Sequence, residues 1–353
     1  MVRAQIVGAT GYGGVGITEM LLRHPEIEIT SLLAKSDIGR PLSDFYPHLR
    51  GFCDRMVEDA TDDRVGQDAD VVVFSTPDRV GMSHAARLVA SGIKVLDYSG
   101  DFRFTGMPLY EGYARDHPNV AGKPHLAPEL LDECVYGVPE VNRARVQKAR
   151  VVGNPGCFAV AMILALAPAI RAGIVDVYSL IADGKTGISG GGKKPSATFH
   201  FPDRNESVTP YRIAGHQHAY ETRATLEQVG GKPVKLTFVP HLVPTTRGII
   251  TTCYANLTRS ISAEEAQALY EDAYRDEPFV RVQPRGVTPG PKAVLGSNLC
   301  DVSVVVDQVN DRLVAIGSID NLLKGQAGVA LQNINLMCGL PETMGLERIP
   351  IYP

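Results

Sequence analysis

The sequence has no long hydrophobic run and no concentration of charge of one sign. Its longest apolar run, Phe158 to Ile170, is shorter than the ~18 residues that a membrane-spanning helix needs, and it contains Pro168. The N-terminus goes directly into a strand-like segment, so we expect neither a signal peptide nor a membrane span. The formal net charge of −4 is spread along the chain. It gives no basis for binding nucleic acid or an anionic membrane.

Paired cysteines and metal-ligand spacings are also absent. The six cysteines are widely separated and form no CxxC pair, so they suggest neither a zinc site nor a disulfide framework. The histidines show no HxxxH spacing, and we expect no metal. These absences favour a globular protein in the reducing cytoplasm. With 353 residues, 44% of them hydrophobic, the chain is long enough for two domains.

The first part of the chain has the order of a dinucleotide-binding domain. Arg3 to Gly8 has the pattern of a buried strand, a glycine-rich turn follows, and Val15 to Arg23 continues as an amphipathic helix. These elements and the later ones predict a parallel, doubly wound Rossmann-type sheet over residues 1–153. The later segments are the strands Ile27–Ala34, Val71–Ser75, Lys94–Tyr98 and Arg150–Gly153, with a helix over Ser83–Ala90.

The second part has strand-like runs that follow one another without helices between them, which predicts an α+β domain with a mixed sheet. We place this catalytic and oligomerisation domain at 154–325, and expect the C-terminal helix, about 326–353, to complete the first domain. Residues 184–215 fit no regular element. The expected strands are Tyr178–Asp183, Val234–Val239, Gly248–Asn256, Leu299–Val309 and Arg312–Ser318, and the helices are Phe158–Ile170, Ala219–Val229, Ala263–Tyr274 and Ala327–Met337.

The glycine-rich turn is the first candidate site. Its spacing is GxxGxxG, and its position after a strand and before a helix is the one that a pyrophosphate-binding turn requires. A tight turn that only needs small residues is the alternative. The predicted cofactor ligands here are Gly8, Thr10, Gly11, Tyr12 and Gly13, with Ser75 at the end of a later strand.

The end of the second strand indicates which dinucleotide binds. An acidic residue there binds the ribose 2′-OH of NAD, whereas a cation accommodates the 2′-phosphate of NADP. The strand ends Lys35-Ser36 and Arg40 follows, which favours NADPH/NADP⁺, although Asp37 points the other way.

Cys157 is the candidate nucleophile. It stands where the strand-like Arg150–Gly153 turns into the apolar helix, and the first turn of a helix favours a thiolate and can hold an oxyanion. The alternative is an inert core cysteine. A thiolate beside a nicotinamide implies hydride transfer to or from a thioester or thiohemiacetal.

Such chemistry needs an acid or base, and Gly215-His216-Gln217-His218 supplies two histidines just before a predicted helix. On an extended segment His216 and His218 would point to the same side, so either could reach Cys157. A structural role is the alternative for each of them.

Several blocks together resemble the N-acetyl-γ-glutamyl-phosphate reductases of arginine biosynthesis, in order over nearly the whole chain. In this chain Gln217 stands where the family motif has arginine. The blocks are Gly8-Ala9-Thr10-Gly11-Tyr12-Gly13-Gly14, Asp101-Phe102-Arg103, Asn154-Pro155-Gly156-Cys157, His200 to Glu206, Gly215 to His218, Pro240 to Pro244 with Arg247-Gly248, and Ile319 to Gly325.

The resemblance implies a fold like that of aspartate-semialdehyde dehydrogenase and an NADPH-dependent reduction of N-acetylglutamyl 5-phosphate to the 5-semialdehyde. Cys157 would form the thioacyl enzyme, and a histidine of the Gly-His-Gln-His segment would act as acid/base. Asn321 would face the nicotinamide. We also expect a homo-oligomer, dimer or tetramer. A substrate with a carboxylate and a phosphate suits arginine, and the candidate substrate ligands are Arg103, Asn154, Ser189, Arg204, Arg212 and Arg247.

Three alternatives stay open. The homologous enzyme of lysine biosynthesis reduces an aminoadipyl phosphate attached to an acidic carrier protein. An NADP-binding regulatory protein could have kept the fold without turnover, although the presence of Cys157, His216 and His218 argues against it. A cysteine hydrolase would leave the N-terminal turn without a purpose.

Overall fold

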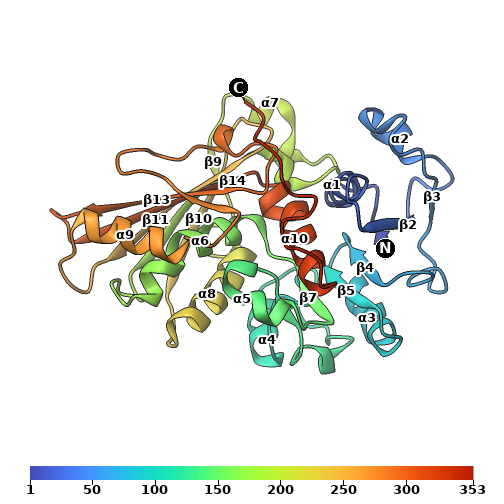
Figure 1. Ribbon diagram of the computed structural model, residues 1–353, viewed down its shortest axis with the longest axis horizontal. Coiled ribbons are helices and arrows are strands. Elements are labelled where there is room, and N and C mark those ends of the chain that lie inside the picture. The colour runs from blue at the N-terminus through green and yellow to red at the C-terminus, as the bar shows by residue number, and fades with distance from the viewer. Residues whose placement is uncertain (353) are drawn as a thin grey trace. The chain divides into compact units, whose positions relative to one another are not determined.

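The computed structural model describes residues 1–352, which divide into two compact units (Figure 1). The first unit comprises Met1–Pro155 and Gln326–Glu347. The second comprises Gly156–Gly325 and the segment that begins at Arg348. Each unit is built around one seven-stranded sheet.

The sheet of the first unit has the strand order β3-β2-β1-β4-β5-β7-β6, and all its pairings are parallel. Its central strand β4 reads Val-Val-Val-Phe and is buried at every position, as expected for a parallel strand covered on both faces. This confirms the predicted Rossmann-type class. The strands are β1 (Val2–Val7), β2 (Ile27–Ala34), β3 (Val57–Asp59), β4 (Val71–Phe74), β5 (Lys94–Asp97), β6 (Val135–Tyr136) and β7 (Val151–Gly153).

Helix α10 lies near the C-terminus of the chain but belongs to the first unit. Its buried polar residues form hydrogen bonds that anchor it there. Asn333 Nδ2 donates to Gly137 O at 2.9 Å, and Asn335 Oδ1 lies 3.0 Å from His24 Nε2. Both asparagines are fully buried, so these contacts fix the helix in register beside α1 and α5. The helices are α1 (Tyr12–Leu21), α2 (Leu42–Phe45), α3 (Val80–Ala90), α4 (Met107–Arg115), α5 (Pro139–Val146) and α10 (Gly328–Met337).

The sheet of the second unit has the order β12-β13-β14-β11-β8-β10-β9 and is mixed. β13, β14, β11 and β8 run antiparallel in turn, whereas β10 pairs with β8 in parallel. The mixed sheet confirms the predicted class. The strands are β8 (Leu180–Thr186), β9 (Thr209–Pro210), β10 (Leu236–Leu242), β11 (Ile249–Asn256), β12 (Val280–Val282), β13 (Cys300–Asp307) and β14 (Arg312–Ile319).

Helix α6 (Cys157–Arg171) forms the core of the second unit. Every residue from Phe158 to Ile170 is buried, because the helix packs on β11 and β14 on one side and on α8 (Gln217–Gly230) and α9 (Ala263–Ala273) on others. A helix that is apolar all round is expected in such a position. Its first residue, Cys157, is thereby fixed at the edge of a rigid core.

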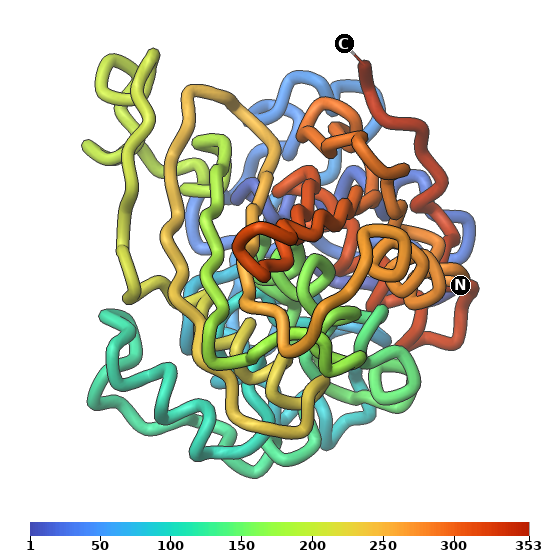
Figure 2. Tube along the Cα trace, turned by 90° about the vertical axis from the view of Figure 1, so that its left-hand side faces the viewer, coloured from blue at the N-terminus to red at the C-terminus, as the bar shows by residue number. Residues whose placement is uncertain are grey.

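Residues 184–215, for which the sequence predicted no regular element, contain only short elements. The first three residues continue β8, because Gly184, Lys185 and Thr186 pair with both β10 and β11. After β8 the chain follows an irregular path, drawn yellow-green in Figure 2, and its strand β9 pairs with β10. The remaining elements are the 3₁₀ turns η3 (Ile188–Gly191) and η4 (Ala197–Phe199) and the single helical turn α7 (Phe201–Arg204).

The predicted boundary at the C-terminus needs a correction. We expected the chain beyond α10 to stay with the first domain, but the segment from Arg348 packs with the second unit. Ile351 N donates to Leu295 O at 2.7 Å, and the Ile351 side chain lies against Gly296. The other boundary falls after Pro155 rather than after Gly153.

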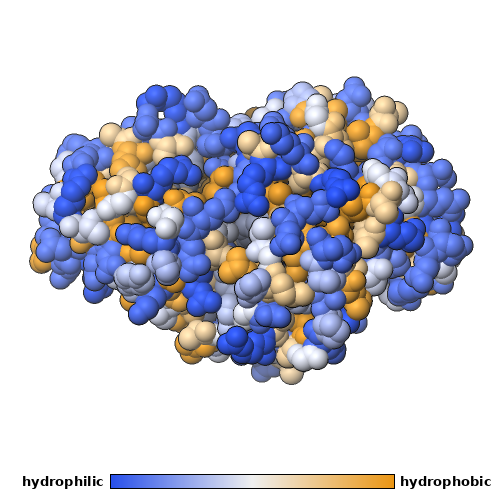
Figure 3. Space-filling view, turned by 90° about the horizontal axis from the view of Figure 1, so that it is seen from below, coloured by the Kyte–Doolittle hydropathy of each residue, from blue (hydrophilic) through white to orange (hydrophobic). Residues whose placement is uncertain are grey.

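Within residues 1–352 no helix has the length and hydropathy to cross a membrane. The same residues contain no group of three or more His, Cys, Asp or Glu side chains that could hold a metal ion. On the face shown in Figure 3, hydrophobic residues occur in small groups among hydrophilic ones.

Candidate active site

The glycine-rich turn leads straight into α1, which begins three residues earlier than predicted. Gly14 lies inside this helix. The position requires glycine because the neighbouring backbone leaves no room for a side chain: a methyl group there would be 2.2 Å from Gly8 O. Gly11 is the N-cap, no side chain caps the helix, and no acidic residue stands in its first turn. The backbone N–H groups are therefore open to an anion, as a pyrophosphate site requires.

Buried polar groups surround this turn. A methyl group on Gly13 would meet Ser75 Oγ at 2.5 Å, Gln326 Nε2 at 2.9 Å and a ring carbon of Tyr98 at 3.1 Å. Thr76 Oγ1, Tyr98 OH and Gln326 Oε1 are buried without a hydrogen-bond partner among the described residues. A polar ligand would satisfy such groups, so the turn fits a dinucleotide. Tyr98 and Gln326 were not predicted, and only folding brings them here.

The residues predicted to bind the 2′-phosphate of NADP follow β2, and their side chains are exposed. Lys35 Nζ lies 3.3 Å from Asp59 Oδ1, and Arg40 Nε lies 3.2 Å from Asp44 Oδ2. Exposed pairs of this kind contribute about 0–1 kcal/mol, so a 2′-phosphate could replace either carboxylate at little cost. Ser36 is exposed between them.

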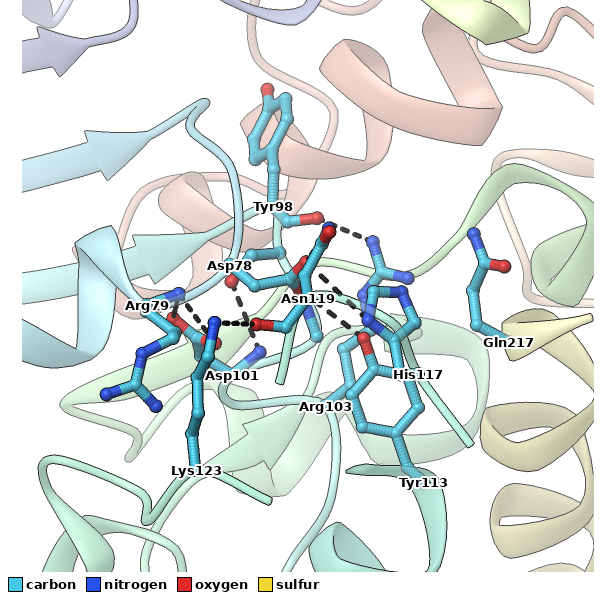
Figure 4. Close-up of polar contacts among 12 residues, drawn as sticks. Asp78, Arg79, Tyr98, Asp101, Arg103, Tyr113, His117, Asn119, Lys123 and Gln217 are labelled. Carbon is cyan, nitrogen blue, oxygen red and sulfur yellow. Dashed lines mark hydrogen bonds and ion pairs between the residues drawn. The ribbon is translucent and has the colours of Figure 1, made fainter. Parts of the chain in front are cut away.

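Two predicted substrate ligands make internal contacts in the first unit. Arg103 donates to Asn154 O at 2.8 Å. It also donates to Tyr98 O at 2.6 Å (Figure 4). The Asn154 side chain is buried and donates to Gln326 O at 3.0 Å. In this structure both residues hold the backbone that leads to Cys157.

Two buried carboxyls precede Arg103: Asp97 ends β5, and Asp101 lies in the loop that follows. Asp101 accepts from the backbone N–H of Arg79, at 2.8 and 3.1 Å to its two oxygens (Figure 4). Burial raises the pKa of Asp101 from 3.8 to about 6. Burial, followed by the charge of Asp101, also raises the pKa of Asp97 well above its usual range.

Cys157 is the first residue of α6, and Gly156 is the N-cap. The residue is only partly buried, unlike Phe158 to Ile170, and no cysteine in residues 1–352 forms a disulfide. The π-helical turn η6 (Leu323–Ala327) passes close by, since a methyl group on Gly325 would lie 2.7 Å from Cys157 Cβ. The thiol is thus accessible at a helix N-terminus, the position that favours a thiolate.

The two histidines lie together, but not for the predicted reason. They are not on an extended segment, because α8 begins at Gln217 and His216 is its N-cap. His216 Nδ1 accepts the backbone N–H of His218 at 3.1 Å, and the two rings are 4.5 Å apart. The expected extended segment was therefore wrong, although the two rings do lie together, because His216 caps the helix that contains His218.

Aromatic side chains enclose the pair. The Phe158 ring lies 6.0 Å from His216 and 6.1 Å from His218, and the Phe238 ring lies 5.4 Å from His216. Tyr211 contacts His216 edge-on at 5.5 Å. Burial, with a smaller contribution from Cys157, raises the pKa of Tyr211 above its usual range, so the phenol stays protonated. Phe158 thus links the nucleophile helix to both histidines.

Glu221 completes this cluster and was not predicted. It is 1% exposed, its Oε2 accepts Gly156 N at 2.9 Å, and its Oε1 lies 3.8 Å from His218 Nε2. The i,i+3 spacing from His218 on a helix is the sequence signal that could have identified it.

Among the remaining arginines, only Arg212 is tied to the histidine segment, because its Nη1 donates to Gln217 Oε1 at 2.7 Å. Arg247 instead pairs with the fully buried Asp320 at 2.9 Å. Arg204 lies on α7, apart from these contacts, with its Nε buried.

The Asn321 carboxamide has partners at both ends within the second unit. Its oxygen accepts Gly248 N at 2.7 Å, and its nitrogen donates to Ser189 Oγ at 3.0 Å. These contacts tie the β8–η3 loop to the start of β11. The cofactor role of Asn321 and the substrate role of Ser189 stay predictions.

Comparisons with known proteins agree with this architecture. Residues 3–149 match the model of the semialdehyde dehydrogenase NAD binding domain, and residues 157–321 match that of the semialdehyde dehydrogenase dimerisation domain. Aspartate semialdehyde dehydrogenase II of Vibrio cholerae, in complex with ASA, superimposes with a TM-score of 0.71 at 18% identity, covering 96% of this chain and 98% of that one. The enzyme of Candida albicans with NADP gives a TM-score of 0.69 at 16% identity, covering 96% and 98%. The fold and the two domains define a protein of the semialdehyde dehydrogenase class.

Full-length relatives narrow this class. N-acetyl-gamma-glutamyl-phosphate reductase of Citrifermentans bemidjiense is 40% identical over 100% of both chains, and that of Laribacter hongkongensis is 43% identical over 100% of both. The protein of the same name from Bacillus cereus is 39% identical over 99% of each. The chain belongs to the N-acetyl-gamma-glutamyl-phosphate reductase family, and the predicted resemblance is confirmed.

Proposed function

We propose that this chain catalyses the NADPH-dependent reduction of N-acetyl-L-glutamyl 5-phosphate to N-acetyl-L-glutamate 5-semialdehyde and phosphate, a step of arginine biosynthesis. The observation that carries the proposal is a partly exposed thiol at the N-terminus of α6, whose next residue packs against two buried histidines. Membership of the reductase family over the full length supports the substrate.

The chemistry follows from this arrangement. The Cys157 thiolate attacks the acyl carbon, the carbon–oxygen bond to phosphate breaks, and phosphate leaves with the electron pair to give a thioester. When bound, the nicotinamide supplies the hydride that turns the thioester into a thiohemiacetal. A histidine protonates the developing oxyanion and then takes this proton back as the carbon–sulfur bond breaks. The aldehyde is released and the thiolate is regenerated.

Of the two histidines, His218 is the better candidate for the acid/base. His216 Nδ1 already accepts a backbone N–H, so a neutral His216 carries its proton on Nε2 and can only donate. We expect His218→Asn to lower kcat by about 10²–10⁴-fold. His216→Asn, which keeps a helix cap, should lower it less. Equal losses in steady-state assays would contradict the assignment.

NADP is the cofactor that the end of β2 supports, through Lys35, Ser36 and Arg40. The matched NAD binding domain supports only a nicotinamide dinucleotide in general. The backbone N–H groups of Tyr12 and Gly13 would hold the pyrophosphate, whereas that of Gly11 donates to Gly8 O at 3.2 Å. For the substrate, Arg212 is the best placed cation, because it is hydrogen-bonded to Gln217, the residue between the two histidines.

The matched dimerisation domain supports a homo-oligomer, and the sheet of the second unit offers the surface for it. One face of this sheet is covered by α6, α8 and α9. The opposite face carries half-buried or exposed side chains, many of them apolar, and a second copy could cover it. They include Ile181, Val239, Ile250, Tyr254, Val305, Val314 and Ile316. Because no cysteine in residues 1–352 forms a disulfide, we propose that the enzyme works in the reducing cytoplasm.

The test is the reverse reaction: NADP⁺ reduction by N-acetylglutamate 5-semialdehyde with and without inorganic phosphate. We expect turnover that depends strictly on phosphate, because phosphate must release the thioacyl group. Turnover of a carrier-linked aminoadipate semialdehyde alone would replace the arginine assignment with the lysine one. Tight NADPH binding without turnover of any aldehyde would indicate a regulatory protein.

A further inference from the structure

A carboxylate buried in the second unit has no role in the mechanism described so far. Glu221 stands in the first turns of α8, and its side chain is only 1% exposed. Burying an ionised carboxylate is costly unless it is paired and hydrogen-bonded. Its partners therefore indicate what it does.

One partner is the backbone next to the nucleophile. Glu221 Oε2 accepts the N–H of Gly156, the residue that caps α6 and immediately precedes Cys157, at 2.9 Å. The carboxylate thus lies at the N-terminus of a 15-residue helix, where the helix dipole stabilises negative charge. Helices α6 and α8 also pack directly against each other.

The other partner is His218. Its Nε2 lies 3.8 Å from Glu221 Oε1, and its side chain is only 11% exposed. A methyl group on Gly156 would lie 2.3 Å from His218 Nε2 and 2.6 Å from Glu221 Oε1. Backbone, imidazole and carboxylate therefore meet at one point, and the absence of a side chain at Gly156 makes this possible.

We propose that Glu221 is a positioning residue for the reaction: its carboxylate holds the ring of His218 against the N-terminus of the nucleophile helix and stabilises the protonated ring. This inference rests on the proposed function, with His218 as acid/base. The protonated ring gives its proton to the thiohemiacetal oxygen and recovers it when the carbon–sulfur bond breaks. Glu221 exchanges no proton in either step.

The decisive variant is Glu221→Gln, assayed in the phosphate-dependent reverse reaction. Glutamine keeps an oxygen that can accept the Gly156 N–H but removes the charge beside His218. We expect kcat to fall by about 10- to 100-fold, part of the 10²–10⁴-fold that general acid–base catalysis supplies. The KM values for semialdehyde and phosphate should change less than about threefold, because substrate binding does not use this charge.

Glu227→Gln is the matched control. Glu227 lies on the same helix and also accepts a backbone N–H, that of Val234 at 3.0 Å. Its neutralisation should leave kcat unchanged. Glu221→Asp, which keeps the charge on a shorter side chain, should retain more activity than Glu221→Gln.

A kcat of Glu221→Gln equal to that of the wild type would overturn the proposal, because it would show that catalysis does not need the charge of Glu221 beside His218. Equal losses in the Asp and Gln variants, together with a lowered melting temperature, would also overturn it by indicating a purely structural role. If the wild-type enzyme itself failed to reduce NADP⁺ with any aldehyde, the proposed function would fail instead. The two failures are thus distinguishable.

Discussion

Two helices of this protein begin in the same way and face different surroundings. Both α1 and α6 directly follow strands of the parallel sheet, both have a glycine N-cap with extended backbone, and neither has a side-chain cap. At α1 the close neighbours of the turn are backbone atoms and neutral side chains. A methyl group on Gly14 would strike Gly8 O and the Ala9 backbone, and one on Gly13 would meet the side chains of Ser75, Gln326 and Tyr98. At α6 the close neighbours of Gly156 are His218 and Glu221.

The same structural feature, an uncapped helix N-terminus after a glycine, can therefore support two different functions. A helix N-terminus lined with backbone N–H groups and neutral side chains can hold an anion but has no group suited to general acid–base catalysis. The same terminus lined with ionisable side chains, with a thiol as its first residue, can do covalent chemistry. The assignment of cofactor binding to the first and catalysis to the second is open to direct tests.

The largest effect is expected at the thiol. Cys157→Ser should lower turnover by at least about 10³-fold, because a serine hydroxyl is not ionised at neutral pH and is a weak nucleophile without activation. NADPH binding, followed by fluorescence, should be nearly unchanged. Turnover close to that of the wild type would show that α6 is not the catalytic terminus.

A pair of glycine substitutions tests the comparison itself. Gly156→Ala should lower kcat by about 10²-fold by displacing His218 and Glu221, and it should leave cofactor affinity intact. Gly14→Ala should weaken NADPH binding about 10-fold or more. The added methyl group would displace the backbone of the turn, and overpacking of this kind costs about 1–3 kcal/mol. Gly112→Ala on α4 is the control, since nothing lies within 4 Å of the added methyl group. If Gly156→Ala instead weakened NADPH binding and Gly14→Ala instead lowered kcat, our assignment of the two helix N-termini would be reversed.

A smaller effect concerns the choice of dinucleotide. Lys35→Ala should weaken NADPH binding about 10-fold, roughly the value of one charge-assisted hydrogen bond, and should change NADH binding little. Lys148→Ala, at an exposed position of the same unit, is the control. Equal loss for NADPH and NADH in titrations would mean that the 2′-phosphate binds elsewhere.

The smallest effect concerns stability, at a buried carboxyl that takes no part in the reaction. The pKa of Asp97 is raised well above 3.8, and that of its neighbour Asp101 to about 6. The folded state therefore keeps protons that the unfolded chain releases, so this pair lowers the free energy of unfolding as the pH rises above about 4. Asp97→Asn should melt a few degrees above the wild type at pH 8 and show no such gain at pH 4. Thermal melts at both pH values check this, and a pH-independent difference would contradict it.

The fold class and the family could be predicted from the sequence, and both were confirmed. The strands that were missed are β3, β6, β9 and β12, which form the outer edges of the two sheets and are only two or three residues long. A segment that short shows no alternation of apolar and polar residues. Its pairing depends on the neighbouring strand rather than on its own pattern.

At the candidate active site the sequence supplied the candidate reactive side chains but not their arrangement. Cys157 at the start of α6 follows from a strand, a turn and an apolar helix, which are local features. The extended path expected for His216 and His218 was wrong, because His216 caps α8 with its own ring.

Local sequence thus determined the longer elements, the glycine-rich turn and the position of the thiol at a helix N-terminus, because each depends on residues that are neighbours in the chain. Only the tertiary structure decided which groups surround that terminus. Gly156 and Glu221 are 65 residues apart in the sequence and meet because α6 packs on α8. Burial of Glu221 and His218 also depends on that packing. A contact of this kind leaves no periodic pattern in the sequence, since its cause is the shared core of the second unit.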